Sequence, residues 1–319
     1  MHVDGAVHVD GAVHVHVEQV AVREPAAILP LAVSTPSSRL RPTGDPLRDV
    51  PFDRERFERF LELTDFWNGW FQPRFEGLEN LASVEGGLLV ANHGLFGIEL
   101  PCLLSGVYRK TGRPLRGLGD RVLFQTPGVR DVATMLGGVE GHPAAAEALI
   151  REGFLCVVCP GGAKEGFAPP SEKYRLKWEG HTGFVRTAIR AGGDLVPLAV
   201  IGSDDFYRQL VDGERVLETP LGRLVTSLFG TKYVPPLYLG LGFFPLPVRL
   251  EFFVGEPMRL ALPKEAADDE RVVAEVHEAF RARLQALLDE GLAKREERLA
   301  RERDDSRTRV ERLALAFAG

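Results

Sequence analysis

Short apolar runs alternate with longer, helically spaced segments through the middle of the chain. The apolar runs that predict buried strands are residues 87–92, 155–159 and 195–201. The helical patterns between and after them cover residues 98–110, 144–151 and 184–191. Continuous apolar strands separated by helices are typical of a mostly parallel sheet with helices on both faces. We therefore expect an α/β fold.

Patterns on either side extend this core. Phe57, Phe60 and Leu61 recur among charged residues, which predicts a helix that runs into the aromatic cluster at residues 66–71. That helix could pack on the core or lie at a lipid interface. Beyond the core, the pattern predicts a strand at 248–254, an amphipathic helix at 272–288 and a mixed-charge segment at 294–312. The charged segment reads as a solvated helix or a partner surface.

The first 51 residues differ from the rest. His2-Val-Asp-Gly-Ala-Val is repeated from His8, and Pro, Ser and Arg are frequent over residues 23–51. This composition predicts a disordered tail, although a histidine-rich tract can also bind metal. The expected organisation is a tail over 1–51, a folded domain over 52–290 and a charged C-terminal helix over 291–319.

Composition narrows the function classes. The 319 residues carry a formal net charge of −6, which argues against nucleic-acid binding as the main task. Three cysteines are too few for a disulfide framework, so a reducing compartment is expected. No signal peptide is recognisable, and no run reaches the roughly 18 apolar residues that span a bilayer. We expect a protein that is soluble or lies on a membrane surface.

His93 stands where an α/β sheet places its ligands, just past the first core strand in Asn92-His93-Gly94-Leu-Phe-Gly97-Ile-Glu99. Glu99 falls at the start of the next helix, where the helix dipole favours a carboxylate. Across this turn Glu99 can fold back onto the imidazole, fix its tautomer and leave the other nitrogen as a general base. The alternative is an ordinary surface His and Glu.

A second motif, Cys159-Pro160-Gly161-Gly162-Ala-Lys164-Glu165, follows the next apolar run. Consecutive glycines expose backbone N–H groups that can hold an anion or a developing oxyanion, or they simply make a tight turn. No Gly-Lys-Ser/Thr follows, so this is not a nucleotide P-loop. Cys156 and Cys159 are three apart in a strand and should point to opposite faces, which opposes a disulfide or a shared metal.

Together the two motifs resemble the lysophospholipid/glycerolipid acyltransferase superfamily. The quoted blocks are Asn92-His93…Glu99, 119–124, Pro160-Gly161-Gly162…Glu165, 196–200 with its central Pro197, and 253–257. The acid six positions after the His, and Pro-Gly-Gly in place of Pro-Glu-Gly, are similar to the diacylglycerol-acyltransferase-like branch. The resemblance covers residues 52–290 and implies a glycerolipid acyltransferase-like fold for that domain.

The resemblance implies transfer of a fatty acyl group from acyl-CoA, or from acyl carrier protein, to the hydroxyl of a glycerolipid or related alcohol. His93 and Glu99 would be catalytic. The substrate-binding residues implied are Arg121, Pro160, Gly161, Gly162, Lys164, Glu165 and Arg175, with Lys173 as a further cation. No metal or cofactor is implied, because acyl-CoA serves as co-substrate. Association with the cytoplasmic face of a membrane, in lipid metabolism or phospholipid biosynthesis, is expected.

Alternatives remain open at this point. A catalytically inactive lipid-binding or carrier protein would keep the same fold, because the third block departs from the common family form. An esterase of the α/β-hydrolase type is weaker, since no Gly-x-Ser-x-Gly is present. The apolar segments 206–207, 225–229 and 233–247 could line an acyl groove, dock on a bilayer or belong to the core.

Overall fold

The computed structural model describes residues 53–126, 128–178, 180–211, 237–239 and 244–318. The tail expected over residues 1–51, its histidine repeat and segment 225–229 lie outside the described residues.

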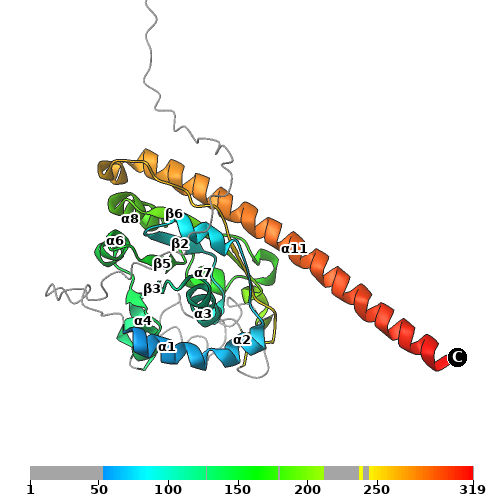
Figure 1. Ribbon diagram of the computed structural model, residues 1–319. Coiled ribbons are helices and arrows are strands. Elements are labelled where there is room, and N and C mark those ends of the chain that lie inside the picture. Colours follow the sequence, from blue (N-terminus) through cyan, green and yellow to red (C-terminus); the bar gives the residue numbers. More distant parts are fainter. Residues whose placement is uncertain (1–52, 127, 179, 212–236, 240–243, 319) are drawn as a thin grey trace, which may run out of the picture. The chain divides into compact units, whose positions relative to one another are not determined.

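A sheet of seven strands organises the described residues (Figure 1). Its strands are β1 (Arg74–Glu76), β2 (Gly87–Ala91), β3 (Leu115–Gly119), β4 (Val139–Glu140), β5 (Leu155–Val158), β6 (Asp194–Ile201) and β9 (Glu251–Val254). Their order is β1-β9-β6-β2-β5-β3-β4. The five strands from β6 to β4 are parallel, whereas β9 pairs antiparallel with β6 and carries β1 parallel to itself. The expected mostly parallel α/β sheet is confirmed. A separate ribbon joins β7 (Arg208–Val211) to β8 (Leu237–Leu239).

Helices cover both faces of the sheet. The longer ones are α1 (Arg54–Leu63), α2 (Asp65–Phe71), α3 (Leu100–Thr111), α5 (Val129–Met135), α6 (Pro143–Arg151), α8 (Gly183–Ala191) and α11 (Glu270–Ala318). The short ones used below are α4 (Arg121–Gln125), α7 (Ala163–Gly166) and the 3₁₀ turn η2 (Leu95–Gly97). The expected helices at 98–110, 144–151 and 184–191 correspond to α3, α6 and α8. Gly112 and Gly192 end α3 and α8 in the left-handed conformation.

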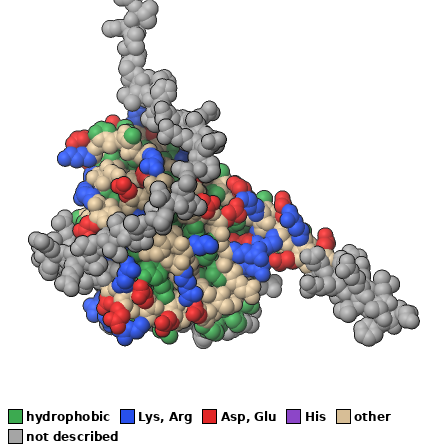
Figure 2. Space-filling model, in the orientation of Figure 1, with side chains coloured by type: hydrophobic (Ala, Val, Ile, Leu, Met, Phe, Trp, Pro, Cys, Tyr) green, Lys and Arg blue, Asp and Glu red, His purple; other side chains and the backbone are tan. Residues whose placement is uncertain are grey.

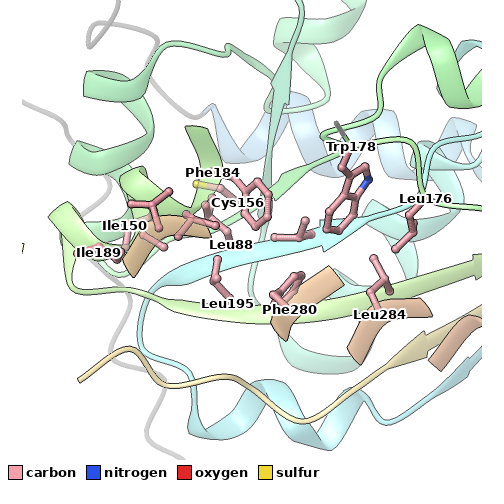
Figure 3. Packing of buried hydrophobic residues seen from close by; sticks show 14 of the residues in the cluster. Leu88, Ile150, Cys156, Leu176, Trp178, Phe184, Ile189, Leu195, Phe280 and Leu284 are labelled. Atoms are coloured by element: carbon pink, nitrogen blue, oxygen red, sulfur yellow. The ribbon is translucent and has the colours of Figure 1, made fainter. Parts of the chain in front are cut away.

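Alternating side chains of β2 feed two separate cores. Leu88 and Val90 join the cluster under α6, α8 and α11, whereas Leu89 and Ala91 join the cluster under α2 and α3. This period of two is what a strand buried on both faces requires. Figure 3 shows the first cluster, in which Trp178 stacks on Phe280 of α11 with ring centroids 6.3 Å apart.

The cysteines follow the same alternation. Cys156 lies in the first cluster and Cys159 packs against the second, as the strand geometry predicts. Phe206 is fully buried, with its ring centroid 4.6 Å from that of Phe71. Of the three interpretations of segment 206–207, core packing is therefore the one that holds for Phe206.

Helix α11 is continuous from residue 270 to 318 (Figure 1). Its first part contributes Phe280, Leu284 and Leu288 to the core beside β6, and the mixed-charge segment continues the same helix without a break. The domain boundary expected near residue 290 stays a prediction. No helix among the described residues combines the length and apolarity needed to cross a bilayer.

Candidate active site

Three neighbouring strands bring separate loops to one edge of the sheet. In the order β6-β2-β5 the central strand is β2, and all three run in the same direction. Their carboxyl ends therefore meet. His93 follows β2, Cys159 follows β5 and Asp204 follows β6. This edge is where open α/β sheets place ligands.

The predicted His–Glu pair is formed. His93 Nδ1 lies 3.2 Å from Glu99 Oε1, and the Gly94 N–H donates to the same oxygen at 3.1 Å. Glu99 is 1% exposed, whereas the His93 side chain is 22% exposed. Glu99 stands at the N-cap of α3, where the partial positive charge of the helix end favours its carboxylate. The pair therefore joins a buried acid to a ring that solvent can reach.

Glycine is required at position 94. A Cβ there would lie 2.5 Å from the Cβ of Ser203 and 2.9 Å from Glu99 Oε2. No other residue lets the loop pass this close to both side chains, so the local sequence allows Glu99 to fold back onto His93.

The Glu165 side chain holds the backbone of His93 in place by a hydrogen bond. Its Oε2 accepts the His93 N–H at 3.0 Å, and its Oε1 accepts the Lys177 N–H at 2.9 Å. A Cβ on Gly161 would come within 2.1 Å of the Glu165 carboxyl carbon, so the Pro-Gly-Gly turn leaves room for this side chain. Burial raises the pKa of Glu165 to about 7, and the two N–H donors partly oppose that rise.

Asn92 locks the strand that carries His93. Its amide nitrogen donates to the Val200 carbonyl at 2.8 Å, and its amide oxygen accepts the Val200 N–H at 2.7 Å. The side chain is buried and replaces two ladder bonds where β2 and β6 end. Removal of such a buried pair typically costs several kcal/mol.

His93 is a stronger base than an ordinary histidine. Burial lowers its pKa, but the neighbouring Cys159 side chain and the Glu99 carboxylate outweigh burial, so the pKa of His93 is raised well above 6.5. Burial raises the pKa of the Cys159 thiol in turn, and the nearby His93 ring opposes that rise. The thiol donates to the Asn92 carbonyl at 3.9 Å.

Asp204 is a further acid of this edge, and sequence reasoning missed it. Burial raises its pKa to about 6, while the Tyr174 N–H, which it accepts at 2.8 Å, opposes the shift. The signal was available, because Ser203-Asp204-Asp205 follows β6 directly, as His93 follows β2. What could not be read from the chain was which strands are neighbours.

The structure does not gather all the predicted substrate-binding residues around His93. Arg121 begins α4 past the end of β3, two strands from β2; its side chain is 75% exposed and lies 3.6 Å from Glu140. Lys164 and Arg175 are exposed. Lys173 pairs with Asp205 at 2.7 Å. Substrate contact by these four residues stays a prediction.

The Pro160-Gly161-Gly162 turn also differs from expectation in one detail. The Gly162 N–H donates to the Cys159 carbonyl at 3.1 Å, within the turn itself. That donor is therefore occupied within the turn. The turn positions Glu165, and its contact with substrate stays a prediction.

Comparison with known proteins decides the family. The family model described as diacylglycerol acyltransferase matches residues 106–300. The chain belongs to this family. The family is named for acyl transfer to diacylglycerol, so an acyl donor and a lipid acceptor are the partners that the family implies.

Relatives of this chain occur in bacteria and animals. An uncharacterized protein of Mycobacterium leprae is 31% identical over 77% of this chain and 67% of its own length. One of Mycobacterium tuberculosis is 31% identical over 73% of this chain and 65% of its own length. The human "DGAT1/2-independent enzyme synthesizing storage lipids" is 24% identical over 71% of this chain and 65% of its own length. The chain thus spans about two thirds of these relatives.

Among solved structures, the 1-acyl-sn-glycerophosphate (LPA) acyltransferase PlsC from Thermotoga maritima matches with a TM-score of 0.42 and 18% sequence identity. The match covers 74% of this chain and 84% of that one.

Proposed function

We propose that this protein transfers a fatty acyl group from acyl-CoA, or from acyl carrier protein, to a hydroxyl of a glycerolipid or related lipid alcohol. His93 is the general base and Glu99 is the residue that orients it. The observation that carries the proposal is the 3.2 Å contact between His93 Nδ1 and Glu99 Oε1 at the carboxyl edge of β2.

The proposed step needs no group beyond the chain and its two substrates. With Glu99 accepting the proton on Nδ1, the lone pair of the imidazole is on Nε2. Nε2 takes the proton of the acceptor hydroxyl as its oxygen attacks the thioester carbonyl. A new C–O bond forms, the C–S bond breaks, and the leaving thiolate takes the proton from the imidazolium. A positioned base of this kind contributes about 10²–10⁴-fold in rate.

Glu99 stabilises the protonated form of His93 that this step produces. When His93 accepts the proton, the carboxylate beside Nδ1 stabilises the positive ring. Glu99 Oε2 is buried and has no hydrogen-bond partner among the described residues, so the only side-chain bond of the carboxylate in this part of the chain goes to His93. Glu99 Oε1 also accepts the Gly94 N–H, and a buried negative charge beside the ring favours the imidazolium strongly.

The test is acyl transfer by purified protein. Labelled acyl-CoA is incubated with lysophospholipid, diacylglycerol and long-chain alcohol acceptors, using wild type, His93→Ala and His181→Ala as an exposed-histidine control. We expect His93→Ala to lose at least 100-fold of the rate with an unchanged melting temperature, and His181→Ala to keep it. Tight lipid binding without turnover in the wild type would instead favour the inactive carrier.

We further propose that the protein works at the cytoplasmic face of a membrane, which it contacts with α1 and α2. Leu63 and Phe66 are 69% and 58% exposed, and Phe66 lies 6.0 Å from the 40%-exposed ring of Phe244. Exposed aromatic side chains beside arginines favour a lipid interface.

Flotation with phosphatidylcholine vesicles tests this surface. Phe66→Ser should reduce the bound fraction several-fold, since burial of one aromatic ring contributes roughly 1.5–3 kcal/mol. Leu299→Ser removes an exposed apolar side chain from α11 and should have no effect. Equal flotation of both variants and the wild type would contradict the proposed contact.

A further inference from the structure

A pocket of about 440 Å³ opens between α2, β1 and α3. It shares no lining residue with the His93 site. Its polar lining consists of three arginines and three neutral hydrogen-bonding side chains: Arg74, Arg109, Arg249, Asn68, Gln72 and Ser105. We call it the arginine pocket. Figure 2 shows Lys and Arg side chains intermixed with Asp and Glu side chains along α11, and Glu302 of this helix pairs with Arg249 of the pocket.

The arginines of the pocket keep hydrogen-bonding capacity. Arg74 is exposed and lies at the start of β1. No described residue forms an ion pair with it. Arg249 donates to Glu302 at 2.8 Å and to Gln72 at 3.2 Å, and Arg109 pairs with Asp65 at 2.5 Å. Each guanidinium has five N–H donors, so even the paired arginines can bind a further anion.

Positive charge is in excess here. Burial lowers the pKa of Arg298, and the nearby charges of Arg74 and Arg249 lower it further. Arg298 pairs with Glu251 and lies 3.6 Å from Glu302. Of the three arginines that line the pocket, Arg109 pairs with Asp65 and Arg249 pairs with Glu302, whereas no described residue forms an ion pair with Arg74. A bound anion would neutralise the remaining charge.

The chemistry of the lining selects among anions. The guanidinium fork bonds two oxygens of a phosphate or carboxylate at once, and a phosphate monoester adds a second negative charge and a third oxygen. Asn68 and Ser105, 3.2 Å apart, can bond the remaining oxygen or an adjoining hydroxyl. The volume exceeds that of an inorganic ion several-fold, which indicates a phosphate carried by a larger molecule.

The sheet register relates the pocket to His93. Arg74 is opposite Glu251, Glu251 is opposite Ile201, and Ile201 lies at the carboxyl end of β6 beside the end of β2. Arg74 therefore stands at the same edge of the sheet as His93. Three strand spacings separate β1 from β2, or about 14 Å. An extended substrate can reach both.

We propose that the arginine pocket binds the phosphate monoester of an elongated substrate whose reacting group lies at His93. The phosphate belongs either to the coenzyme of the acyl donor or to a phosphorylated lipid headgroup. Binding at the pocket stands on its lining alone, whereas the link to His93 rests on the proposed function.

The test measures binding to the full chain by calorimetry and flotation. The probes are coenzyme A, dephospho-coenzyme A, inorganic phosphate, and phosphatidylcholine vesicles with or without phosphatidate. Arg74→Gln and Arg249→Gln each remove one pocket charge. Arg271→Gln removes an equal charge from the far end of α11, where the side chain is 85% exposed. Circular dichroism verifies folding, and Arg74 is the more informative site because it has no described ion pair whose loss would perturb the fold.

The source of the phosphate follows from which probe responds. If it is the donor, both pocket variants bind coenzyme A at least tenfold more weakly, and wild type binds dephospho-coenzyme A as weakly as they do. If it is the lipid, the variants lose phosphatidate-dependent flotation while the two coenzymes bind alike. Inorganic phosphate competes in either case. Wild-type-like binding of every probe by Arg74→Gln and Arg249→Gln, or an equal loss in Arg271→Gln, overturns the proposal.

A separate arm keeps this proposal distinct from the acyl-transfer proposal. His93→Ala should bind the responding probe as wild type does. If no acceptor is acylated by wild type and Arg74→Gln still weakens binding tenfold, the pocket stands and the proposed reaction fails. If wild type turns over and Arg74→Gln matches it in KM and in probe binding, the pocket fails and the reaction stands.

Discussion

The His93 site and Arg74 of the arginine pocket lie at the same edge of the sheet, but the two regions are held together by different kinds of contact. At the His93 edge, buried carboxylates and an amide hold the loops by bonds to backbone N–H groups, as Glu165 and Asn92 do. In the arginine pocket, charged side chains pair with other side chains, and Arg74 has no described ion pair. The first region fixes geometry, which proton transfer requires. The second offers positive charge and hydrogen-bond donors, which in our proposal bind a phosphate.

The largest effect expected is from Glu99→Gln. The buried neutral amide cannot stabilise the imidazolium or hold the tautomer in the same way, so kcat should fall by about 10²–10⁴-fold. The pKa of His93 should also fall, moving the acidic limb of the pH–rate profile to lower pH. Glu275→Gln, at a 52%-exposed position on α11, is the control. If kcat and the acidic limb of the pH–rate profile are both unchanged, Glu99 does not take part in catalysis.

Glu165→Gln tests how much the hydrogen bonds from Glu165 to backbone N–H groups contribute to the stability of the His93 edge. The folded pKa of about 7 is above the ordinary 4.5, so wild type loses stability as pH rises from about 4.5 to about 7. Gln lacks this titration. Relative to wild type, the unfolding free energy of the variant should therefore rise by up to about 3 kcal/mol between pH 5 and pH 8.

Urea unfolding of both proteins at the two pH values measures this difference. The variant should also lower kcat, because its amide NH₂ faces a backbone N–H of His93 or Lys177. A pH-independent difference in stability would mean that Glu165 is charged in the folded protein throughout this range.

The pH dependence of the two regions should diverge. His93 must be unprotonated to act as a base and its pKa is raised, so kcat/KM should fall about tenfold per pH unit below a midpoint well above 6.5. Arginine keeps its charge, so probe binding at the pocket should be flat between about pH 7.5 and 9. Parallel pH profiles of kcat/KM and of probe binding would show that one group controls both.

The smallest effect expected is from Cys159→Ala. The thiol lies beside His93, but burial raises its pKa. In the proposed reaction the acyl group passes directly from thioester to hydroxyl, so no enzyme nucleophile is needed. The rate should stay within about tenfold of wild type. The acidic limb should move to lower pH, because the Cys159 side chain raises the pKa of His93. Loss of turnover together with a trapped acyl-protein in wild type would instead indicate a covalent intermediate on Cys159.

Much of the site was predictable from local patterns. His93 and Glu99 were identified from their places at a strand end and a helix start, and the structure joins them. For the two glycines at 161–162 the sequence left two interpretations open, an anion-binding loop and a tight turn, but it did not indicate that the turn makes room for Glu165. The N–H of Gly162 bonds within the turn, and Gly161 makes room for Glu165. The Glu165 carboxylate accepts backbone N–H groups from Lys177, 12 residues later in the chain, and from His93, 72 residues earlier. Contacts between such distant residues cannot be read from a local pattern.

The sequence alone determined the alternation of buried strands and helices. A strand that is buried on both faces is apolar at every position, and this can be recognised within the strand alone. The sequence also determined the pairing of His93 with Glu99, because both belong to one strand–loop–helix turn. Strand order does not follow from such local patterns. Only the tertiary structure brings β6, β2 and β5 together, which places Asp204 and Cys159 near His93, and only it sets β9 and β1 antiparallel to β6. That reversal brings Arg74 and Arg249 to the same edge as His93, since the start of a reversed strand lies beside the end of its neighbour.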